Sequence, residues 1–97
     1  MDINKLHYFF RAAELKNFTK ASERCHIAQT TMSKYIAVLE QELGCKLFIR
    51  SSKSMVLTRQ GQLFYEEMRK IAERYQELCQ EIQRMDNLEL RIGMITT

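Results

Sequence analysis

The sequence has 97 residues, of which 45% are hydrophobic and 28% charged, and its formal net charge is +3. This balance is typical of one small globular domain and argues against intrinsic disorder. The positive charge is concentrated in residues 1–57, where nine Lys/Arg face five Asp/Glu, whereas residues 58–86 contain five against six. A basic surplus of this size suits a polyanionic partner without proving one.

Several function classes lack their signatures in this sequence. Three cysteines at distant positions, with no CxxC pattern, predict neither a disulfide framework nor a zinc site. No apolar run approaches the roughly 20 residues that span a bilayer, and none resembles a signal peptide. No serine, histidine and acid arrangement, phosphate-binding loop or paired carboxylate motif is present. We therefore expect a cytoplasmic protein that is not an enzyme, with no metal, no cofactor and no membrane partner.

Two helices are predicted in the first 25 residues. Residues 1–15 contain apolar side chains at spacings of three and four, which form one buried stripe: Ile3, Leu6, Phe9/Phe10 and Ala13. Asp2 is the expected N-cap. A short second helix is predicted from residue 20 to about residue 25, with Thr19 as its cap. Residues 26–28 form the expected turn.

A third helix is predicted from residue 29 to residue 43, and Gly44 ends it as a C′ glycine. Its expected buried stripe is Met32, Ile36, Leu39 and Leu43. The opposite side has Thr30, Lys34, Ala37 and Gln41, flanked by Thr31 and Ser33. Small hydroxylated and basic residues fill its N-terminal half, and the acids Glu40 and Glu42 lie in the C-terminal half. Residues 17–44 thus have the pattern of a helix-turn-helix that reads DNA, although an ordinary solvated face would look similar.

The pattern changes after Gly44. Residues 45–57 contain two short apolar or β-branched runs around a serine-rich loop, which predicts a small β-hairpin. A hairpin directly after a recognition helix is a wing. Arg50 and Lys53 at or near its tip could then contact phosphates or the minor groove.

A long helix is predicted over residues 58–86, capped by Thr58. Its apolar residues keep alternating spacings of four and three, which is a heptad repeat of the coiled-coil type. The expected dimerisation residues are Phe64, Met68, Ile71, Tyr75, Leu78, Ile82 and Met85. An exposed apolar stripe of this length favours a homodimer over a monomer. Gly61, one turn inside the helix, predicts close packing against another helix.

Residues 87–97 break the heptads and alternate like a strand. A single strand has no partner here, so we interpret this segment as the start of a missing domain or as a tail. The expected fold class is mainly α, with a winged helix-turn-helix of three helices and a two-stranded wing in residues 1–57, followed by a long dimerisation helix.

Residues 1–61 resemble the N-terminal winged helix-turn-helix of LysR-type transcriptional regulators, in register and without gaps. The matching residues are Leu6, Phe9, Phe18, Thr19, Ala21, Gln29, Ser33, Ile36, Leu39, Glu40, Leu43, Gly44, Leu47, Phe48, Arg50, Leu57, Thr58 and Gly61. Residues 58–86 are similar to the linker helix of that family, and LELRIG resembles the first strand of its effector-binding domain.

This resemblance implies a module that binds double-stranded DNA at an inverted-repeat operator, as a dimer or, in a full-length form, a tetramer. A small-molecule effector would act only through the absent C-terminal domain. It implies DNA contacts for Gln29, Thr30, Thr31, Ser33, Lys34 and Arg50, and the candidate set also includes Thr19, Lys20, Tyr35 and Lys53. Ala28 and Thr30 replace the usual serine and proline, so Thr30 or Thr31 could cap the helix instead. The alternative is a partner-binding module with a winged-helix shape that does not use DNA.

Overall fold

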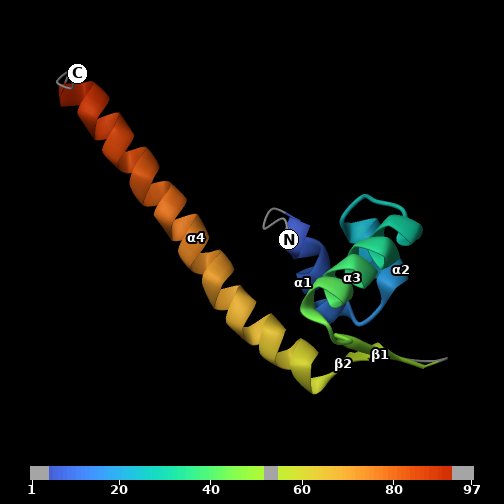
Figure 1. Ribbon diagram of the computed structural model, residues 1–97. Helices are drawn as coiled ribbons and strands as arrows, with labels where there is room; N and C mark the ends of the chain where they lie inside the picture. Colours follow the sequence, from blue (N-terminus) through green and yellow to red (C-terminus); the bar gives the residue numbers. More distant parts are fainter. Residues whose placement is uncertain (1–4, 52–54, 93–97) are drawn as a thin grey trace. The chain divides into compact units, whose positions relative to one another are not determined.

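The structure, a computed structural model, describes the backbone of residues 5–51 and 55–92, and their side chains as far as residue 86. Within these ranges the chain forms four helices and two antiparallel strands (Figure 1). They are α1 (Leu6–Leu15), α2 (Phe18–Arg24), α3 (Gln29–Leu43), β1 (Phe48–Arg50), β2 (Met55–Leu57) and α4 (Arg59–Ile92). The chain divides into two compact units, Met1–Glu66 and Glu67–Thr97, and α4 contributes to both. The predicted fold class is confirmed.

Phe9 of α1 lies at the centre of the hydrophobic core of the first unit. It is fully buried, and its ring centroid lies 5.6 Å from that of Phe48 and 5.2 Å from that of Phe64. Such tilted and edge-on contacts add to the energy of apolar burial. The other buried apolar side chains are Leu6, Ala12, Ala13, Phe18, Ala21, Met32, Ile36, Leu39, Leu47, Phe48 and Met55. The predicted stripe of the first helix is confirmed, except that Ile3 lies outside the described residues.

The predicted start of the first helix is wrong. α1 begins at Leu6, because Lys5 before it has φ −96° and ψ 0°, which is not an α-helical conformation. No side chain caps the helix there. The expected cap, Asp2, lies outside the described residues. α1 ends where predicted, since Lys16 after it adopts a left-handed conformation and its N–H donates to the carbonyl of Ala12 at 2.9 Å.

The cap of the second helix also differs from the prediction. Oδ1 of Asn17 accepts a hydrogen bond from the backbone N–H of Lys20 at 2.9 Å, so Asn17 and not Thr19 is the N-cap. Asparagine caps helices more strongly than threonine. α2 therefore starts at Phe18 and includes Thr19 in its first turn.

The turn between α2 and α3 is built from residues 26–28, as predicted. His26 has φ 59°, and the N–H of Ile27 donates to the carbonyl of Ser22 at 3.0 Å. Ile27 is half-buried and packs against the core, which fixes the corner between the two helices.

α3 has the predicted bounds. Its N-cap position is Ala28, with no side-chain cap, so neither Thr30 nor Thr31 replaces the missing serine. Gly44 ends the helix with φ 75°, a conformation that favours glycine, and its N–H donates to the carbonyls of Glu40 and Gln41.

The buried stripe of α3 differs from the prediction at its C-terminal end. Leu43 is 42% exposed, whereas Glu40 is only 8% exposed. The chain after Gly44 returns over the side of α3 that contains Glu40. The backbone N–H groups of Leu47 and Phe48 in this segment donate to the Glu40 carboxylate. At this end of α3 the side that is buried therefore contains Glu40, and Leu43 is left exposed.

The predicted hairpin is confirmed. β1 and β2 pair in the register Phe48↔Leu57, Ile49↔Val56 and Arg50↔Met55. Phe48 and Met55 are buried, whereas Ile49 and Val56 are exposed on the other face. The hairpin tip is outside the described residues, and the predicted contact residue Lys53 lies there.

Thr58 caps α4, as predicted, and joins it to the hairpin. Its hydroxyl accepts from the N–H of Gly61 at 2.9 Å and donates to the carbonyl of Lys46 at 2.7 Å. Gly61 is buried, and a Cβ atom there would overlap the carbonyl oxygen of Leu47. The predicted close packing is correct, but its partner is the backbone between α3 and β1 rather than another helix.

α4 continues to Ile92, beyond the predicted end at residue 86. The strand-like interpretation is therefore wrong for residues 87–92, and residues 93–97 lie outside the described part. Leu, Glu and Arg are strong helix formers, and no glycine or proline intervenes before Gly93, so the helix continues.

The second unit contains the C-terminal part of the heptad repeat. Its exposed apolar side chains are Ile71, Tyr75, Leu78, Ile82 and Met85, each at least 41% exposed. Arg74 pairs with Glu81 at 3.1 Å and with Glu77 at 3.6 Å. The hydrogen bond and the charge of Glu81, with a smaller contribution from Glu77, raise the pKa of the Arg74 guanidinium.

Candidate nucleic-acid interface

The first two turns of α3 present small polar side chains and one lysine. Met32 and Ile36 are fully buried and hold the helix on the core. On the other side Thr30, Thr31 and Lys34 are exposed and Ser33 is half-buried. The predicted outward face therefore exists. Its short hydroxylated side chains would allow a close approach to base edges, and each hydroxyl can donate or accept a hydrogen bond.

The N-termini of α2 and α3 meet at this face. The hydroxyl of Thr19, in the first turn of α2, donates to Oε1 of Gln29, the first residue of α3, at 3.1 Å. Both side chains are exposed. Two residues that sequence analysis proposed as separate DNA contacts are thus joined to each other.

Arg50 connects the wing to α2. Its guanidinium lies over the ring of Phe18, the first residue of α2, and that ring packs edge-on against Phe48 of β1. A cation over an aromatic face is attracted by the ring quadrupole. Arg50 remains exposed, and this contact fixes the direction of its side chain. The pair could not be predicted from the sequence, because no local pattern relates positions 32 residues apart.

Three cations lie on the elements of the helix-turn-helix and the wing: Lys20 on α2, Lys34 on α3 and Arg50 on β1. All three are exposed, and none forms an ion pair with another residue in the described part of the chain. Their charges are therefore available to an anionic partner.

Tyr35 does not belong to this exposed face. It is half-buried, its ring packs edge-on against Tyr8 of α1 at a centroid distance of 5.4 Å, and its hydroxyl oxygen is buried. This placement makes Tyr35 a packing residue between α1 and α3. A direct contact of its hydroxyl with DNA, which the sequence allowed, does not fit this position.

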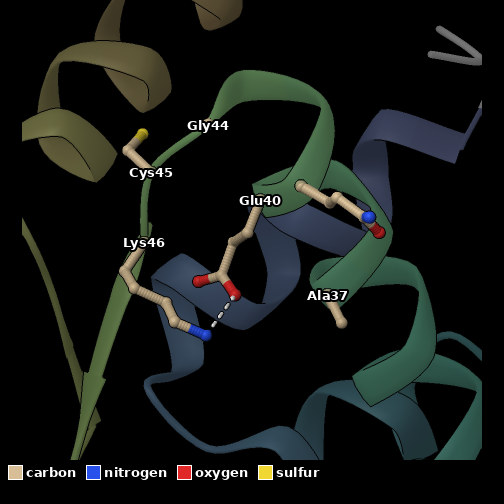
Figure 2. A pocket seen from close by; sticks show the side chains of 6 residues that line it. Ala37, Glu40, Gly44, Cys45 and Lys46 are labelled. Atoms are coloured by element: carbon tan, nitrogen blue, oxygen red, sulfur yellow. Dashed lines mark ion pairs between the residues drawn. The ribbon is translucent and has the colours of Figure 1, made fainter.

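Glu40 has a structural role that sequence analysis missed. It was expected on the solvated side, but its carboxylate is buried and accepts the N–H of Leu47 at 2.8 Å and that of Phe48 at 3.4 Å. Figure 2 shows the same carboxylate facing Lys46, whose Nζ lies 3.8 Å away. Glu40 therefore fixes the start of the wing to α3.

An open hollow of about 460 Å³ lies beside Glu40, lined by Ala37, Glu40, Gln41, Gly44, Cys45 and Lys46 (Figure 2). In the part of the chain that the structure describes, no cluster of three or more His, Cys, Asp or Glu could hold a metal ion. No helix there is long and apolar enough to cross a membrane. Burial raises the pKa of the Cys25 thiol, which keeps it protonated at neutral pH.

Known proteins resemble this chain in sequence and in fold. Residues 3–62 match the family described as "Bacterial regulatory helix-turn-helix protein, lysR family". The chain is 42% identical over 83 residues to the uncharacterized regulator YcgK of Bacillus subtilis, with 86% of this chain and 26% of that protein covered. It is 33% identical over 97 residues to the regulator BenM of Acinetobacter baylyi, with 98% and 32% covered. The chain thus spans about a quarter to a third of the length of these relatives.

Solved structures of DNA-binding domains are also similar to this chain. The BenM DNA-binding domain in complex with catB site 1 DNA superposes with a TM-score of 0.85 at 32% identity, covering 90% of this chain and 94% of that one. The CbnR DNA-binding domain in a DNA complex gives 0.84 at 30% identity, covering 89% and 99%. The fold is that of a winged-helix DNA-binding domain. The chain belongs to the LysR family of bacterial regulatory helix-turn-helix proteins and contains the DNA-binding domain of that family.

Proposed function

We propose that this chain is the sequence-specific DNA-binding module of a bacterial transcription regulator. In this proposal the first two turns of α3 enter the major groove, where Gln29, Thr30, Ser33 and Lys34 reach base edges. Arg50 on the wing contacts the backbone or the minor groove. The observation that carries the proposal is the exposed, small and hydroxylated side of α3, directly opposite its buried stripe.

Charge supports the same orientation. Lys20, Lys34 and Arg50 are exposed on α2, α3 and the wing, whereas Glu40 is turned into the protein and bound to backbone N–H groups. A polyanion approaching the N-terminal half of α3 therefore meets exposed cations, and the carboxylate of Glu40 is turned away from it. Such phosphate contacts position the protein, and the base contacts specify the sequence.

The chain would bind as a homodimer through the heptad repeat of α4. The exposed side chains from Ile71 to Met85 form an apolar stripe that a second copy would cover. A pair of reading helices related by two-fold symmetry suits an inverted-repeat operator. In a longer protein the dimers could form a tetramer, and a small-molecule effector would bind a domain outside this chain. The module would act in the cytoplasm and would not be an enzyme.

Selection of bound duplexes from a random pool tests this proposal. The expected result is an enriched inverted repeat, whose affinity falls steeply as salt is raised because each phosphate contact releases counterions. Lys34→Ala and Arg50→Ala should both weaken operator binding, while Lys70→Ala on the second unit serves as a control for loss of one positive charge. Unchanged affinity for both test variants would remove these residues from the interface.

The competing function is a partner-binding module that uses the same face for protein. It predicts that no duplex is enriched and that the side chains of Thr30, Ser33 and Lys34 become protected when the chain dimerises. Hydrogen exchange of the backbone amides in the first turns of α3 distinguishes the two functions, because protection should appear on adding DNA in the first case and on raising the protein concentration without DNA in the second.

A further inference from the structure

We propose that Thr19 is a positioning residue, which turns the amide group of Gln29 so that Gln29 presents N–H donors to DNA and selects guanine. This inference rests on the proposed DNA-binding function and extends it to the base read at one position. It starts from the hydrogen bond in which the Thr19 hydroxyl donates to Oε1 of Gln29 at 3.1 Å.

Thr19 is well placed to act as a fixed donor. The cap made by Asn17 anchors the first turn of α2, and the hydroxyl of Ser22, which is 3% exposed, donates to the backbone carbonyl of Thr19 at 2.8 Å. Phe18 beside it is buried and packs against Phe48 of the wing. The backbone at Thr19 is therefore fixed by the contacts of Asn17, Phe18 and Ser22. Its hydroxyl can then orient the side chain of Gln29.

Gln29 is the more mobile partner of the pair. It is exposed at the first position of α3, where its long side chain would otherwise sample several rotamers. The Thr19 hydroxyl donates to Oε1 of Gln29. The other end of the amide, Nε2, forms no hydrogen bond with any residue that the structure describes. The amide nitrogen, with its two N–H donors, is thus the end of Gln29 that is available to a ligand.

The orientation of the amide decides which base edge fits. Guanine presents two adjacent acceptors in the major groove, N7 and O6, and both match an amide that offers N–H groups. The bidentate pairing of glutamine with adenine needs Oε1 and Nε2 side by side, because adenine offers one donor and one acceptor. Cytosine offers a donor and is disfavoured. With Oε1 turned toward Thr19, the amide therefore favours guanine over adenine.

Four substitutions in the 97-residue chain separate positioning from contact, using selection from a random duplex pool as the readout. Gln29→Ala identifies the base pair that Gln29 reads, as the position that loses its preference. At that position the wild type should select guanine. Thr19→Val removes the hydroxyl at nearly constant shape, and the ratio of guanine to adenine should fall roughly tenfold, which is the size of one good base contact. Thr19→Ser, which keeps the hydroxyl, should retain the wild-type ratio.

Gln29→Glu supplies a positive test. One carboxylate oxygen would take the Thr19 hydrogen bond and the other would present an acceptor, so the preferred base should change to cytosine, whose N4 amino group is a donor. Thr19→Val should leave the salt dependence of binding and the thermal unfolding midpoint unchanged, because Thr19 is exposed and is not itself a phosphate contact in this proposal.

The outcomes are distinguishable from failure of the proposed function. If the wild type enriches no sequence, the DNA-reading function itself is wrong. If the wild type enriches an operator but selects adenine at the Gln29 position, or if Thr19→Val keeps the wild-type ratio there, DNA reading stands and the positioning role of Thr19 is overturned. A change in salt dependence for Thr19→Val with an unchanged base ratio would make Thr19 a phosphate contact instead.

Discussion

The guanidinium carbon of Arg50 lies 4.2 Å from the centroid of the Phe18 ring, so the last residue of β1 stacks on the first residue of α2. Phe18 is 7% exposed and its ring packs at 5.5 Å from that of Phe48, the first residue of the same strand. This contact fixes the direction of an exposed cation. The wing is therefore held against the helix-turn-helix by the residue that is also its candidate DNA contact.

Substitutions at Arg50 should separate its charge from its stacking. Arg50→Ala should weaken operator binding and reduce the slope of log affinity against log salt by about one, since one phosphate contact is lost. Arg50→Lys keeps the charge but loses the planar group that stacks on Phe18, so we expect an intermediate affinity with the wild-type slope. Fluorescence anisotropy over a salt series measures both quantities. Equal affinities for Arg50→Lys and the wild type would show that stacking does not contribute.

Glu40 should contribute to stability through the backbone groups that it binds. Glu40→Leu would leave the N–H groups of Leu47 and Phe48 without their acceptor, and a buried unsatisfied donor costs about 1–3 kcal/mol. Glu40→Gln keeps one acceptor oxygen and should lose less. Urea unfolding gives the free energies, and Gln41→Leu at the neighbouring exposed position is the control, with a change within about 0.5 kcal/mol. If Glu40→Leu were as stable as this control, Glu40 would not hold the wing.

Gly61→Ala should destabilise the protein, although helix propensity alone predicts the opposite sign. In an exposed helix interior alanine is about 1 kcal/mol more favourable than glycine. At residue 61 the added methyl group would overlap the carbonyl oxygen of Leu47, and overpacking of this kind costs about 1–3 kcal/mol. Thermal and urea unfolding should therefore show a loss. Gln60→Ala, one position earlier and exposed, should be close to neutral, and a stabilising effect of Gly61→Ala would contradict the close approach.

The sequence was most informative where the signals are local. The bounds of α3 follow from the spacing of Met32, Ile36 and Leu39 and from Gly44, all of which lie within one element. The start of α2 was misplaced because Asn17 and Thr19 both belong to the residue types that cap helices and lie two residues apart, and the prediction chose the weaker cap. The continuation of α4 to Ile92 shows a similar ambiguity, since alternating Leu and Glu also suit a helix.

The parts of the candidate site that sequence analysis missed depend on contacts between distant residues. Phe18 meets Arg50, Thr19 meets Gln29, and Glu40 meets the backbone of Leu47 only after the helices and the wing have packed. A single sequence contains the chemical groups of these pairs but no information on their distances. The outward face of α3 could be predicted, whereas the contacts that orient its neighbours could not.

The apolar stripe of the second unit should control oligomeric state. Ile71 and Leu78 are 49% and 41% exposed in the single chain, and a homodimer through α4 would bury them. Ile71→Asp or Leu78→Asp would place an unpaired carboxylate in that interface, which is costly in an apolar surrounding. We expect the wild type to sediment as a dimer and both variants as monomers.

Gln76→Asp adds the same charge at an exposed position outside the repeat and should stay dimeric. Operator affinity should fall with the loss of the dimer, because two linked reading helices bind more tightly than one. A wild type that sediments as a monomer, or Asp variants that remain dimeric, would contradict this use of α4.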